Sequence, residues 1–382
     1  MSSEINQSAT LGYKISKVLR YIKMYGFQRT YIKIKSNLHM KKTDEFEGAG
    51  WINPTGSNTG DVALVGCGNF SYSTIAFYLT KYAKGNIKYA LDLDKAKSRS
   101  LINDYNGFKA ITNFEEVLAD PDIKLVFVAS NHATHAEYAV RAINAGKNVQ
   151  IEKPHAVNFE QLEEVRVAMK NNPEVKVFLG FNRPRSELFK ELQSICNKEE
   201  GISSFNWFVA GHDIEENHWY HSEKEGGRIM GNLCHWSDLC IHSIGLEKAF
   251  PCIITPADLP KSKSNFSVSL SFADGSNATI TFSAKKDPFE GVRETLIIHR
   301  GNVFGVLKDF YELTMDIGPK KIVRKPFYRD HGHKANIVNS YVNTISPGSG
   351  ETIEYVYATG LLVLKIKEAV ESNNKITCSL DI

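Results

Sequence analysis

The 382-residue chain has few of the features that mark secreted, membrane-spanning or metal-binding proteins. Its six cysteines are scattered, with no CxxC pair and no zinc-ligand spacing, so we expect free thiols, a reduced cytoplasmic compartment and no metal site. No run of about 18 apolar residues occurs, which argues against a membrane-spanning helix. The first apolar stretch is interrupted by Lys14, Lys17 and Arg20, so we expect no secretory leader.

The chain also has little net charge, and that charge is unevenly spread. A value of +3 argues against a dedicated nucleic-acid-binding protein. Residues 1–42 carry nine Lys and Arg against one acid, Glu4, so the remainder is net negative. The composition, 42% hydrophobic and 23% charged, is that of a globular protein, and the length indicates two folded domains.

From residue 61 to residue 181, strand-like and helix-like patterns alternate. Short apolar runs that favour buried strands lie at 61–68, 87–94, 123–130, 148–154 and 175–181. Helical patterns lie between them at 72–84, 95–105, 135–146 and 160–172. This alternation predicts a doubly wound parallel sheet of the Rossmann type.

The pattern changes after residue 182 and predicts an α+β domain with a large, mostly antiparallel open-faced sheet, over 182–382. Strand-like alternation recurs at 203–210, 266–273, 277–284, 293–299 and 302–308. Asp274 and Gly275 form a hairpin-turn pair, and helices are expected at 334–346 and 355–371. We find no internal repeat and no low-complexity tract.

The first motif with chemical meaning is Gly66-Cys67-Gly68-Asn69-Phe70-Ser71, directly after a strand and at the start of a helix. Two glycines allow a tight turn and close approach to a diphosphate, which the helix N-terminus stabilises. Ser71 replaces the third glycine of the usual pattern. Asp92 ends the next strand, where an acid binds a ribose hydroxyl. Because Asp92 and Asp94 would repel a 2′-phosphate, NAD is favoured over NADP.

Other polar residues follow later strands of the predicted sheet. Asn131 comes after one strand, at the edge where ligands of such sheets bind. His135 begins a helix and fits either a cofactor contact or a packing role. Lys153 follows Glu152 at another strand end, where an ammonium group stabilises a developing alkoxide; an exposed charged turn is the alternative.

The second domain contains a glycine-initiated helix with polar residues at three-residue spacing, Asn232, His235 and Asp238. These positions share one helix face. A histidine there fits a proton carrier near neutral pH, although a single helix histidine is commonly structural.

Together these residues resemble the Gfo/Idh/MocA family of oxidoreductases, from about residue 61 to the C-terminus. The most specific segment is HAEYAVRAINAGKNVQIEKP. The segments VGCGNFS, GFNRPRSEL, HWYHSEKEGGRIMGNLCHWSDL and DHGHKANIVNSYVNTI are similar to one subgroup, which is associated with surface-polysaccharide synthesis.

The resemblance implies a Rossmann domain over 61–181, a sheet domain that mediates homodimers or homotetramers, and catalysis by Lys153 and His235. His235 would move the proton, and Lys153 would orient substrate and stabilise the oxyanion. The implied NAD-binding residues are Gly66, Gly68, Asn69, Phe70, Asp92, Ser130, Asn131, His135, Glu152, Lys153 and Asn182. The implied residues for a sugar or nucleotide-sugar substrate are Arg183, Arg185, His218, Trp219, Tyr220, Arg228, Asn232 and His235.

The sequence departs from the family pattern at two positions. Asn232 stands where family members usually carry Asp or Glu, and an amide does not exchange protons as a carboxylate does. Pro184 interrupts a stretch usually written as paired arginines, leaving Arg183 and Arg185 on either side.

Three functions fit these observations. The first is an NAD-dependent dehydrogenase or reductase acting on a sugar or nucleotide-sugar, with the arginines meeting anionic phosphates. The second is a redox-neutral epimerase or glycosidic-cleavage enzyme that retains its NAD. The third is a non-catalytic NAD-binding partner subunit, in which Asn232 marks lost chemistry.

Residues 1–60 form a basic extension and linker that the resemblance does not cover. Over 11–27, apolar residues at helical spacing predict an amphipathic helix, and 43–60 is linker-like. Residues 11–42 fit the protein's own surface, a partner or an anionic membrane, and we favour the first. Deletion of residues 1–55 is then expected to lower stability or solubility but to leave NAD affinity unchanged. The predicted apolar face comprises Leu11, Ile15, Val18, Leu19, Ile22 and Tyr25.

Overall fold

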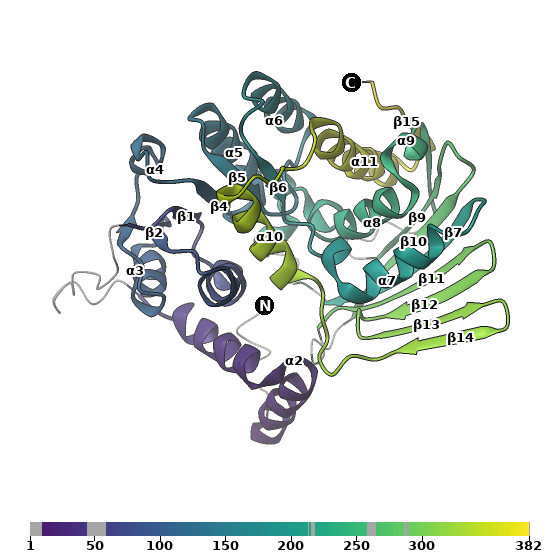
Figure 1. The fold of residues 1–382 in the computed structure, drawn as a ribbon, viewed down its shortest axis with the longest axis horizontal. Coiled ribbons are helices and arrows are strands. Elements are labelled where there is room, and N and C mark those ends of the chain that lie inside the picture. Colours follow the sequence, from purple (N-terminus) through teal and green to yellow (C-terminus); the bar gives the residue numbers. More distant parts are fainter. Residues whose placement is uncertain are drawn as a thin grey trace. The chain divides into compact units, whose positions relative to one another are not determined.

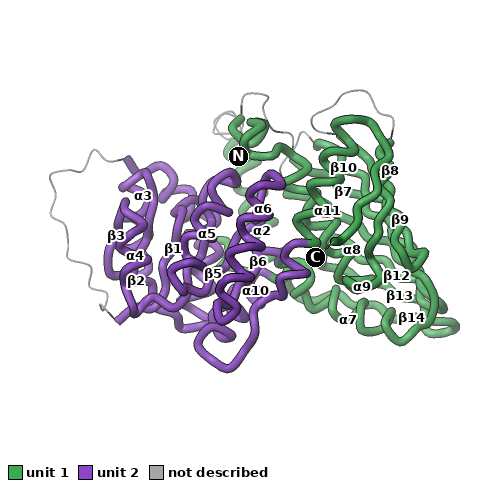
Figure 2. The backbone as a smooth tube through the Cα atoms, turned by 90° about the horizontal axis from the view of Figure 1, so that it is seen from above, with its two compact units in different colours: residues 1–30, 182–332, 358–382 green, residues 31–181, 333–357 purple. Residues whose placement is uncertain are grey.

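The computed structural model describes residues 10–43, 59–212, 214, 218–257, 265–285, 289 and 291–381. The described residues form two compact units (Figure 2). One unit draws on Met1–Thr30, Asn182–Gly332 and Ala358–Ile382, and the other on Tyr31–Phe181 and His333–Tyr357. After the strands of the second sheet up to β14, the chain therefore returns to the unit of the first sheet at His333–Tyr357. The sequence-based division assigned all of residues 182–382 to one domain. Most of the predicted linker, 43–60, lies outside the described residues.

The unit of Tyr31–Phe181 contains a six-stranded sheet in the order β3-β2-β1-β4-β5-β6 (Figure 1), in which every pair is parallel. The central strands β1 and β4 are buried throughout, as expected for a sheet covered on both faces. Short β3 is the strand of this sheet that the sequence pattern did not predict. The strands are β1 (Val62–Val65), β2 (Ile87–Leu91), β3 (Lys109–Ile111), β4 (Leu125–Val128), β5 (Asn148–Ile151) and β6 (Val177–Leu179).

Helices pack on this sheet at the predicted places. The predicted helix after β1 consists largely of two π-helical segments, η1 and η2. Helix α10 is distant in sequence but contributes Ile337 and Tyr341 to the core, and the Tyr341 hydroxyl donates to Asp61 Oδ2 at 2.8 Å. The segments are η1 (Ser71–Ala76), η2 (Leu79–Ala83), α3 (Lys95–Asp104), α4 (Glu115–Ala119), α5 (His135–Asn144), α6 (Phe159–Asn171) and α10 (His333–Ile345).

The other unit contains a nine-stranded sheet in the order β14-β13-β12-β11-β7-β10-β9-β8-β15. Only the β7–β10 pair is parallel, so the predicted mostly antiparallel sheet is confirmed. Strict alternation of buried and open side chains in β7 means that one face of the sheet is covered. The strands are β7 (Ser203–His212), β8 (Cys252–Pro256), β9 (Phe266–Ser271), β10 (Asn277–Lys285), β11 (Arg293–Arg300), β12 (Val303–Lys308), β13 (Glu312–Ile317), β14 (Lys320–Arg324) and β15 (Ile376–Cys378).

The covering helices of this unit include α8, which carries the sequence-predicted histidine. Most of its residues are buried, so it is a core helix rather than a surface one. The remaining α-helices described downstream of the first sheet are α7 (Glu187–Cys196), α8 (Cys234–Ile244), α9 (Leu246–Ala249) and α11 (Ile353–Ser372).

Helix α2 (Leu11–His39) is present where a helix was predicted, but its orientation differs from the prediction. Leu11, Ile15, Val18 and Leu19, expected on the buried face, are exposed, and Leu11 keeps 74% of its surface. The helix is interrupted at Gly26, whose backbone is non-helical at φ 82°. The apolar residues at helical spacing therefore did not predict which side of this helix packs against the protein.

Two expectations from the sequence, on membrane-spanning helices and on free thiols, can be compared with the structure. Among the described residues no helix is long and apolar enough to cross a membrane. All six cysteines are free and buried, in agreement with the expected thiols.

Candidate active site

The glycine turn after β1 has the backbone that a dinucleotide-binding loop requires. Gly66 has φ +84°, and a Cβ there would lie 2.5 Å from the carbonyl oxygen of Ala129, so only glycine fits. A Cβ at Gly68 would meet no atom within 4 Å, which leaves its surroundings open to a ligand. Ser71 replaces the third glycine without a clash and donates its hydroxyl to Gly66 O at 2.5 Å. The turn fits a dinucleotide diphosphate.

Asp92 lies beside this turn, as the sequence predicted for a ribose-binding acid. Its Oδ2 accepts a hydrogen bond from the backbone N–H of Cys67 at 2.6 Å, and its Oδ1 accepts from Asp94 N at 2.8 Å. The half-buried carboxylate is thereby fixed at the end of β2. Asp94 instead caps α3, because its side chain accepts a hydrogen bond from Ala96 N at 3.0 Å.

His135 holds two predicted site segments together. Its Nδ1 lies 2.8 Å from Pro154 O and its Nε2 lies 3.0 Å from Ser130 O. The ring is 2% exposed, and burial lowers its pKa, so the neutral imidazole donates to one carbonyl at a time. His135 is thus positioned to orient the segments after β4 and β5. Asn131, between them in sequence, is exposed.

Glu152 and Lys153 follow β5 in the order predicted. The Glu152 side chain is buried, and burial raises its pKa to about 7. A Cβ on Gly180 would collide with its carboxyl group, so glycine is required there. Lys153 is half-buried, and the Lys153–Pro154 peptide bond is cis. Lys153 therefore lies just after the end of β5, next to the buried carboxyl group of Glu152. This position suits a side chain that binds a polar ligand.

Arg183 differs from its predicted role as an anion ligand. Its guanidinium pairs bidentately with Glu294, with Nε–Oε2 at 2.9 Å and Nη2–Oε1 at 3.0 Å, and both side chains are buried. Trp236 Nε1 donates to the same carboxylate at 2.7 Å, and the guanidinium lies over the indole ring. Burial alone would raise the pKa of Glu294, but Arg183 and His331 hold it well below its usual range. The geometry places Arg183 in the core of its unit.

Two more residues named from the resemblance have internal partners. Asn182, expected to contact the cofactor, is buried and donates from Nδ2 to His331 O at 2.5 Å. Arg228, expected to contact the substrate, is buried, donates to His212 O and lies 4.9 Å from the Phe282 ring centroid. Both contacts stabilise the second unit locally. Arg185, by contrast, is half-buried beside His242, whose pKa burial lowers to about 4.

Asn232, Tyr220 and His235 are polar residues of the second unit that the resemblance names, and the first two are hydrogen-bonded to each other. Asn232 lies in a π-helical segment, Ile229–Leu233, that leads into α8. The Tyr220 hydroxyl donates to Asn232 Oδ1 at 3.1 Å, and burial raises the pKa of Tyr220, which keeps it a neutral donor. His235 is 8% exposed, whereas Trp219 remains 46% exposed. His218 Nδ1 accepts from Tyr220 N at 3.2 Å, which fixes this short loop.

Asp238, predicted on the same face as Asn232 and His235, has a different environment. It is fully buried and its Oδ1 accepts from Thr359 Oγ1 at 3.0 Å. This contact ties α8 to α11, so Asp238 has a structural role.

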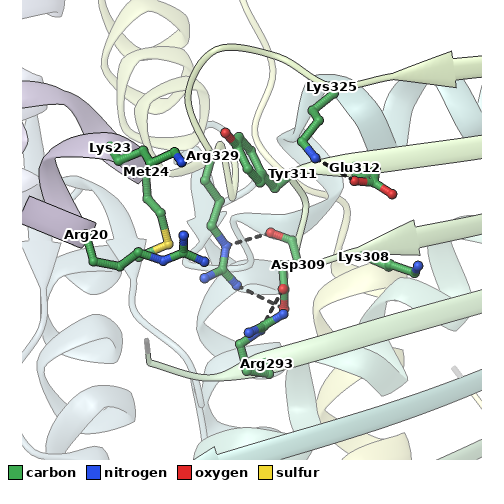
Figure 3. A pocket seen from close by; sticks show the side chains of 10 residues that line it. All are labelled: Arg20, Lys23, Met24, Arg293, Lys308, Asp309, Tyr311, Glu312, Lys325 and Arg329. Carbon is green, nitrogen blue, oxygen red and sulfur yellow. Dashed lines mark hydrogen bonds and ion pairs between the residues drawn. The ribbon is translucent and has the colours of Figure 1, made fainter. Parts of the chain in front are cut away.

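A separate cavity of about 280 Å³ lies in the second unit (Figure 3). Arg293 and Arg329 both approach Asp309, with Arg293 Nε 2.7 Å from its Oδ2, and Lys325 pairs with Glu312 at 2.9 Å. No residue predicted for the active site lines this cavity. Its lining consists of Arg20, Lys23, Met24, Arg293, Lys308, Asp309, Tyr311, Glu312, Lys325 and Arg329.

Sequence reasoning missed several groups that hold the site residues in place. Glu294 is 111 residues from its partner Arg183, and no local motif marks it. His155 directly follows the Lys153-Pro154 pair, is buried and contacts Val356 O at 3.0 Å, with its pKa lowered by burial to about 4. In the sequence, only its position next to Lys153-Pro154 could have indicated that His155 lies near the site.

Comparison with known proteins supports the family resemblance over the first sheet. Residues 61–181 match the Gfo/Idh/MocA model, described as an oxidoreductase family with an NAD-binding Rossmann fold. An uncharacterized oxidoreductase, YrbE of Bacillus subtilis, is 25% identical over 42% of this chain and 47% of its own length. The 1,5-anhydro-D-fructose reductase of Ensifer adhaerens is 41% identical over 20% of this chain and 22% of its own. The chain thus matches less than half the length of these two relatives.

Similarity to a solved structure extends further along the chain. The structure of levoglucosan dehydrogenase in complex with NADH and L-sorbose has a TM-score of 0.71 and 16% identity, covering 84% of this chain and all but 1% of the other. At this identity the likeness establishes the fold. Residues 61–181 are therefore similar to the NAD-binding Rossmann domain of the Gfo/Idh/MocA oxidoreductases, and the two sheets have the fold of the solved dehydrogenase.

The Arg183–Glu294 pair yields a stability prediction. Glu294→Gln leaves the buried guanidinium without its counter-charge, and should lower the free energy of unfolding by about 3–5 kcal/mol at pH 7. Because the folded pKa of Glu294 is depressed, its contribution is present above the unfolded pKa of about 4.3 and is lost as pH falls through the folded value. Chemical denaturation of the wild type and the variant at several pH values measures this.

A matched control is Arg324→Ala, which removes an exposed arginine that pairs with Glu191 at 2.9 Å. Loss of this pair should cost under about 1 kcal/mol. If Glu294→Gln were no more destabilising than this control, Arg183 would again be a candidate for anion binding.

Proposed function

We propose that this protein is an NAD-dependent oxidoreductase that transfers a hydride between nicotinamide and a hydroxyl or ketone carbon of a sugar or nucleotide-sugar. The observation that carries the proposal is the glycine turn with an open Gly68 and with Asp92 fixed at its side. A reductase of an anhydro-sugar and a levoglucosan dehydrogenase among similar proteins support a sugar-like substrate.

The proposed cofactor contacts are formed by the chain's own backbone and polar groups. The glycine turn would hold the diphosphate and Asp92 would accept from a ribose hydroxyl. Ser130, Asn131, Glu152 and Lys153 remain proposed contacts toward the nicotinamide half. NAD, when bound, supplies or accepts the hydride.

The proposed chemistry divides two tasks between Lys153 and His235. Hydride transfer creates or consumes charge on the substrate oxygen, so one group must stabilise charge and another must carry a proton. The Lys153 ammonium suits the first task, and the His235 imidazole suits the second. Asn232, held by Tyr220 at 3.1 Å, is proposed as a neutral ligand for substrate hydroxyls.

A redox-neutral use of the same chemistry is the second candidate, with tightly held NAD returning its hydride to the substrate. It uses the same glycine turn and Asp92 as the first candidate, whereas Asn232 in place of a relay carboxylate bears on a non-catalytic role. Mass spectrometry of the purified protein distinguishes the candidates. Retained NAD with sugar conversion and no net NADH supports the second, and net NADH formation supports the first. Bound NAD without conversion of any sugar would support a non-catalytic subunit.

Two finer parts of the proposal concern context. We propose a role in surface-polysaccharide synthesis, supported by the segments around Arg183 and His235 that resemble that subgroup. We also propose a homodimer or homotetramer, supported by the open-faced sheet, and sedimentation velocity tests it.

Asp92 should give this protein a preference for NADH over NADPH. A 2′-phosphate beside this carboxylate meets like-charge repulsion of more than about 1 kcal/mol, which corresponds to at least about fivefold weaker binding. Fluorescence titration with both cofactors measures the ratio. Asp92→Ala should narrow it, whereas Asp94→Ala, which removes the cap of α3, should have a smaller effect. Tighter NADPH binding by the wild type would contradict this prediction.

Lys153→Ala and His235→Ala should each lower kcat by roughly 10²–10⁴, the usual scale of oxyanion and acid–base contributions. His235→Ala should leave NADH affinity unchanged, while Lys153→Ala should weaken it modestly. Single-turnover hydride transfer with an identified substrate is the measurement. A near-native rate in His235→Ala would remove this residue from the mechanism and direct attention to Tyr220 and its neighbours His218 and His221.

A further inference from the structure

The second half of α2, residues 31–39, packs on the glycine turn of the parallel-sheet unit. Lys33 Nζ donates to Asn69 Oδ1 at 2.5 Å, and Ser36 Oγ donates to Asn69 O at 3.3 Å. His39 Nε2 lies 2.7 Å from Cys67 O. Ser36 and His39 are 0% and 1% exposed. These three hydrogen bonds come from consecutive turns of one helix and reach Cys67 and Asn69, the loop residues on either side of Gly68.

These contacts fix the direction of the loop's N–H groups. In a planar trans peptide the C=O and the following N–H point in opposite directions. With Cys67 O held by His39, the N–H of Gly68 points away from α2, toward the open space around that glycine. Asp92 holds the N–H of Cys67 at 2.6 Å. Both backbone polar groups of Cys67 are therefore fixed. Its N–H is held by Asp92 at the end of β2, and its C=O is held by His39 of α2.

The state of His39 follows from its surroundings. A carbonyl oxygen only accepts, so Nε2 carries the proton and donates to Cys67 O. The ring stacks on Tyr72 with centroids 4.3 Å apart, and its Nδ1 has no hydrogen-bond partner among the described residues. Burial lowers the pKa of His39, which keeps the ring neutral. His39 thus acts on the loop through one directed hydrogen bond.

Lys33 supplies what the loop itself lacks. Between Asp61 and Lys81 the chain has no basic residue, so the turn itself offers a diphosphate hydrogen-bond donors and the partial charge of a helix end, but no formal positive charge. Dinucleotide diphosphates carry two negative charges, and an ammonium group strengthens their hydrogen bonding. The half-buried Lys33 places that charge at Asn69, the second residue after Cys67.

We propose that Lys33 and His39 of this segment belong to the dinucleotide-binding site, Lys33 as a ligand of the cofactor's diphosphate and His39 as a positioning residue for the Gly68 N–H. This deepens the proposed function and rests on it. The segment lies outside residues 61–181, the part that matches the family model. It also changes the expectation that deletion of residues 1–55 leaves NAD affinity unchanged: that deletion should weaken it.

The test compares four variants of the full chain by NADH fluorescence titration at low and high salt, with ADP-ribose as a competing ligand. Lys33→Ala should weaken both ligands about tenfold and flatten the salt dependence. The control Lys35→Ala removes an equal charge from the same helix, on a side chain that pairs with Asp104 at 3.5 Å, and should stay within about twofold of wild type. His39→Leu should weaken NADH, and His39→Gln, which keeps an N–H donor, should recover part of the loss.

The outcomes separate the proposal from the function on which it rests. Equal affinities for Lys33→Ala and Lys35→Ala at both salt concentrations would overturn the role of Lys33 while wild-type NADH binding upheld the Rossmann assignment. Equal losses in His39→Leu and His39→Gln would overturn the role of the directed hydrogen bond. Absence of NADH binding by the wild type would overturn the proposed function itself.

Discussion

The close approach of two backbones is the constraint on which the first unit depends. Gly66 lies against Ala129 and Ser130, with no room for a Cβ, so the turn after β1 and the segment after β4 meet at one edge of the sheet. His135 then joins the segment after β4 to Pro154 after β5 through two carbonyls. The ends of β1, β4 and β5, which are neighbours in the sheet, are thereby held together by one glycine and by a histidine that donates to either of two carbonyls. The polar residues on those ends share an edge because the backbone between them is tied, and this is what an ordered binding site requires.

The second unit is organised differently, around a buried charge. Glu294 receives Arg183, Trp236 and His331, so the chain after β6, helix α8 and the strand β11 converge on one carboxylate. Burying such ions is costly, and the cost is offset only when each hydrogen-bonding position is filled. Arg183 and Trp236 meet this condition with three hydrogen bonds of 2.7–3.0 Å. The position of α8, and with it His235, is set by this network rather than by apolar packing alone.

Sequence patterns predicted the two sheets and most of their helices because burial periodicity is local. The strands over 61–181 are buried on both faces and read as apolar runs, and β7 reads as alternation. Short β3 was not predicted because only Ile111 of its three residues is buried, so it is not an apolar run like the equally short β6. Strands β8, β13, β14 and β15 of the second sheet were not predicted either. The glycine turn and the position of Asp92 beside it could be predicted because both lie within one local strand–helix–strand segment, from β1 to the end of β2. Arg183 was read as an anion ligand because charge is visible in a sequence, whereas a partner 111 residues away is not.

The N-terminal helix α2 is a second case in which the sequence pattern did not predict the contacts found in the structure. Its apolar spacing predicted a docked helix, yet Leu11 and Leu19 are exposed and the contacts that place residues 31–39 are polar ones from Ser36 and His39. Apolar residues at helical spacing indicate which face of a helix can cover a hydrophobic core. They do not indicate whether a helix docks through hydrogen bonds to backbone carbonyls. Gly26 interrupts the helical backbone between the two halves, so each half has its own set of contacts. Because the carbonyls in question belong to a glycine turn without basic residues, docking of the second half both orders that turn and adds the charge it lacks. An extension that looks like an appendage in sequence thus contributes to the local chemistry of the Rossmann domain.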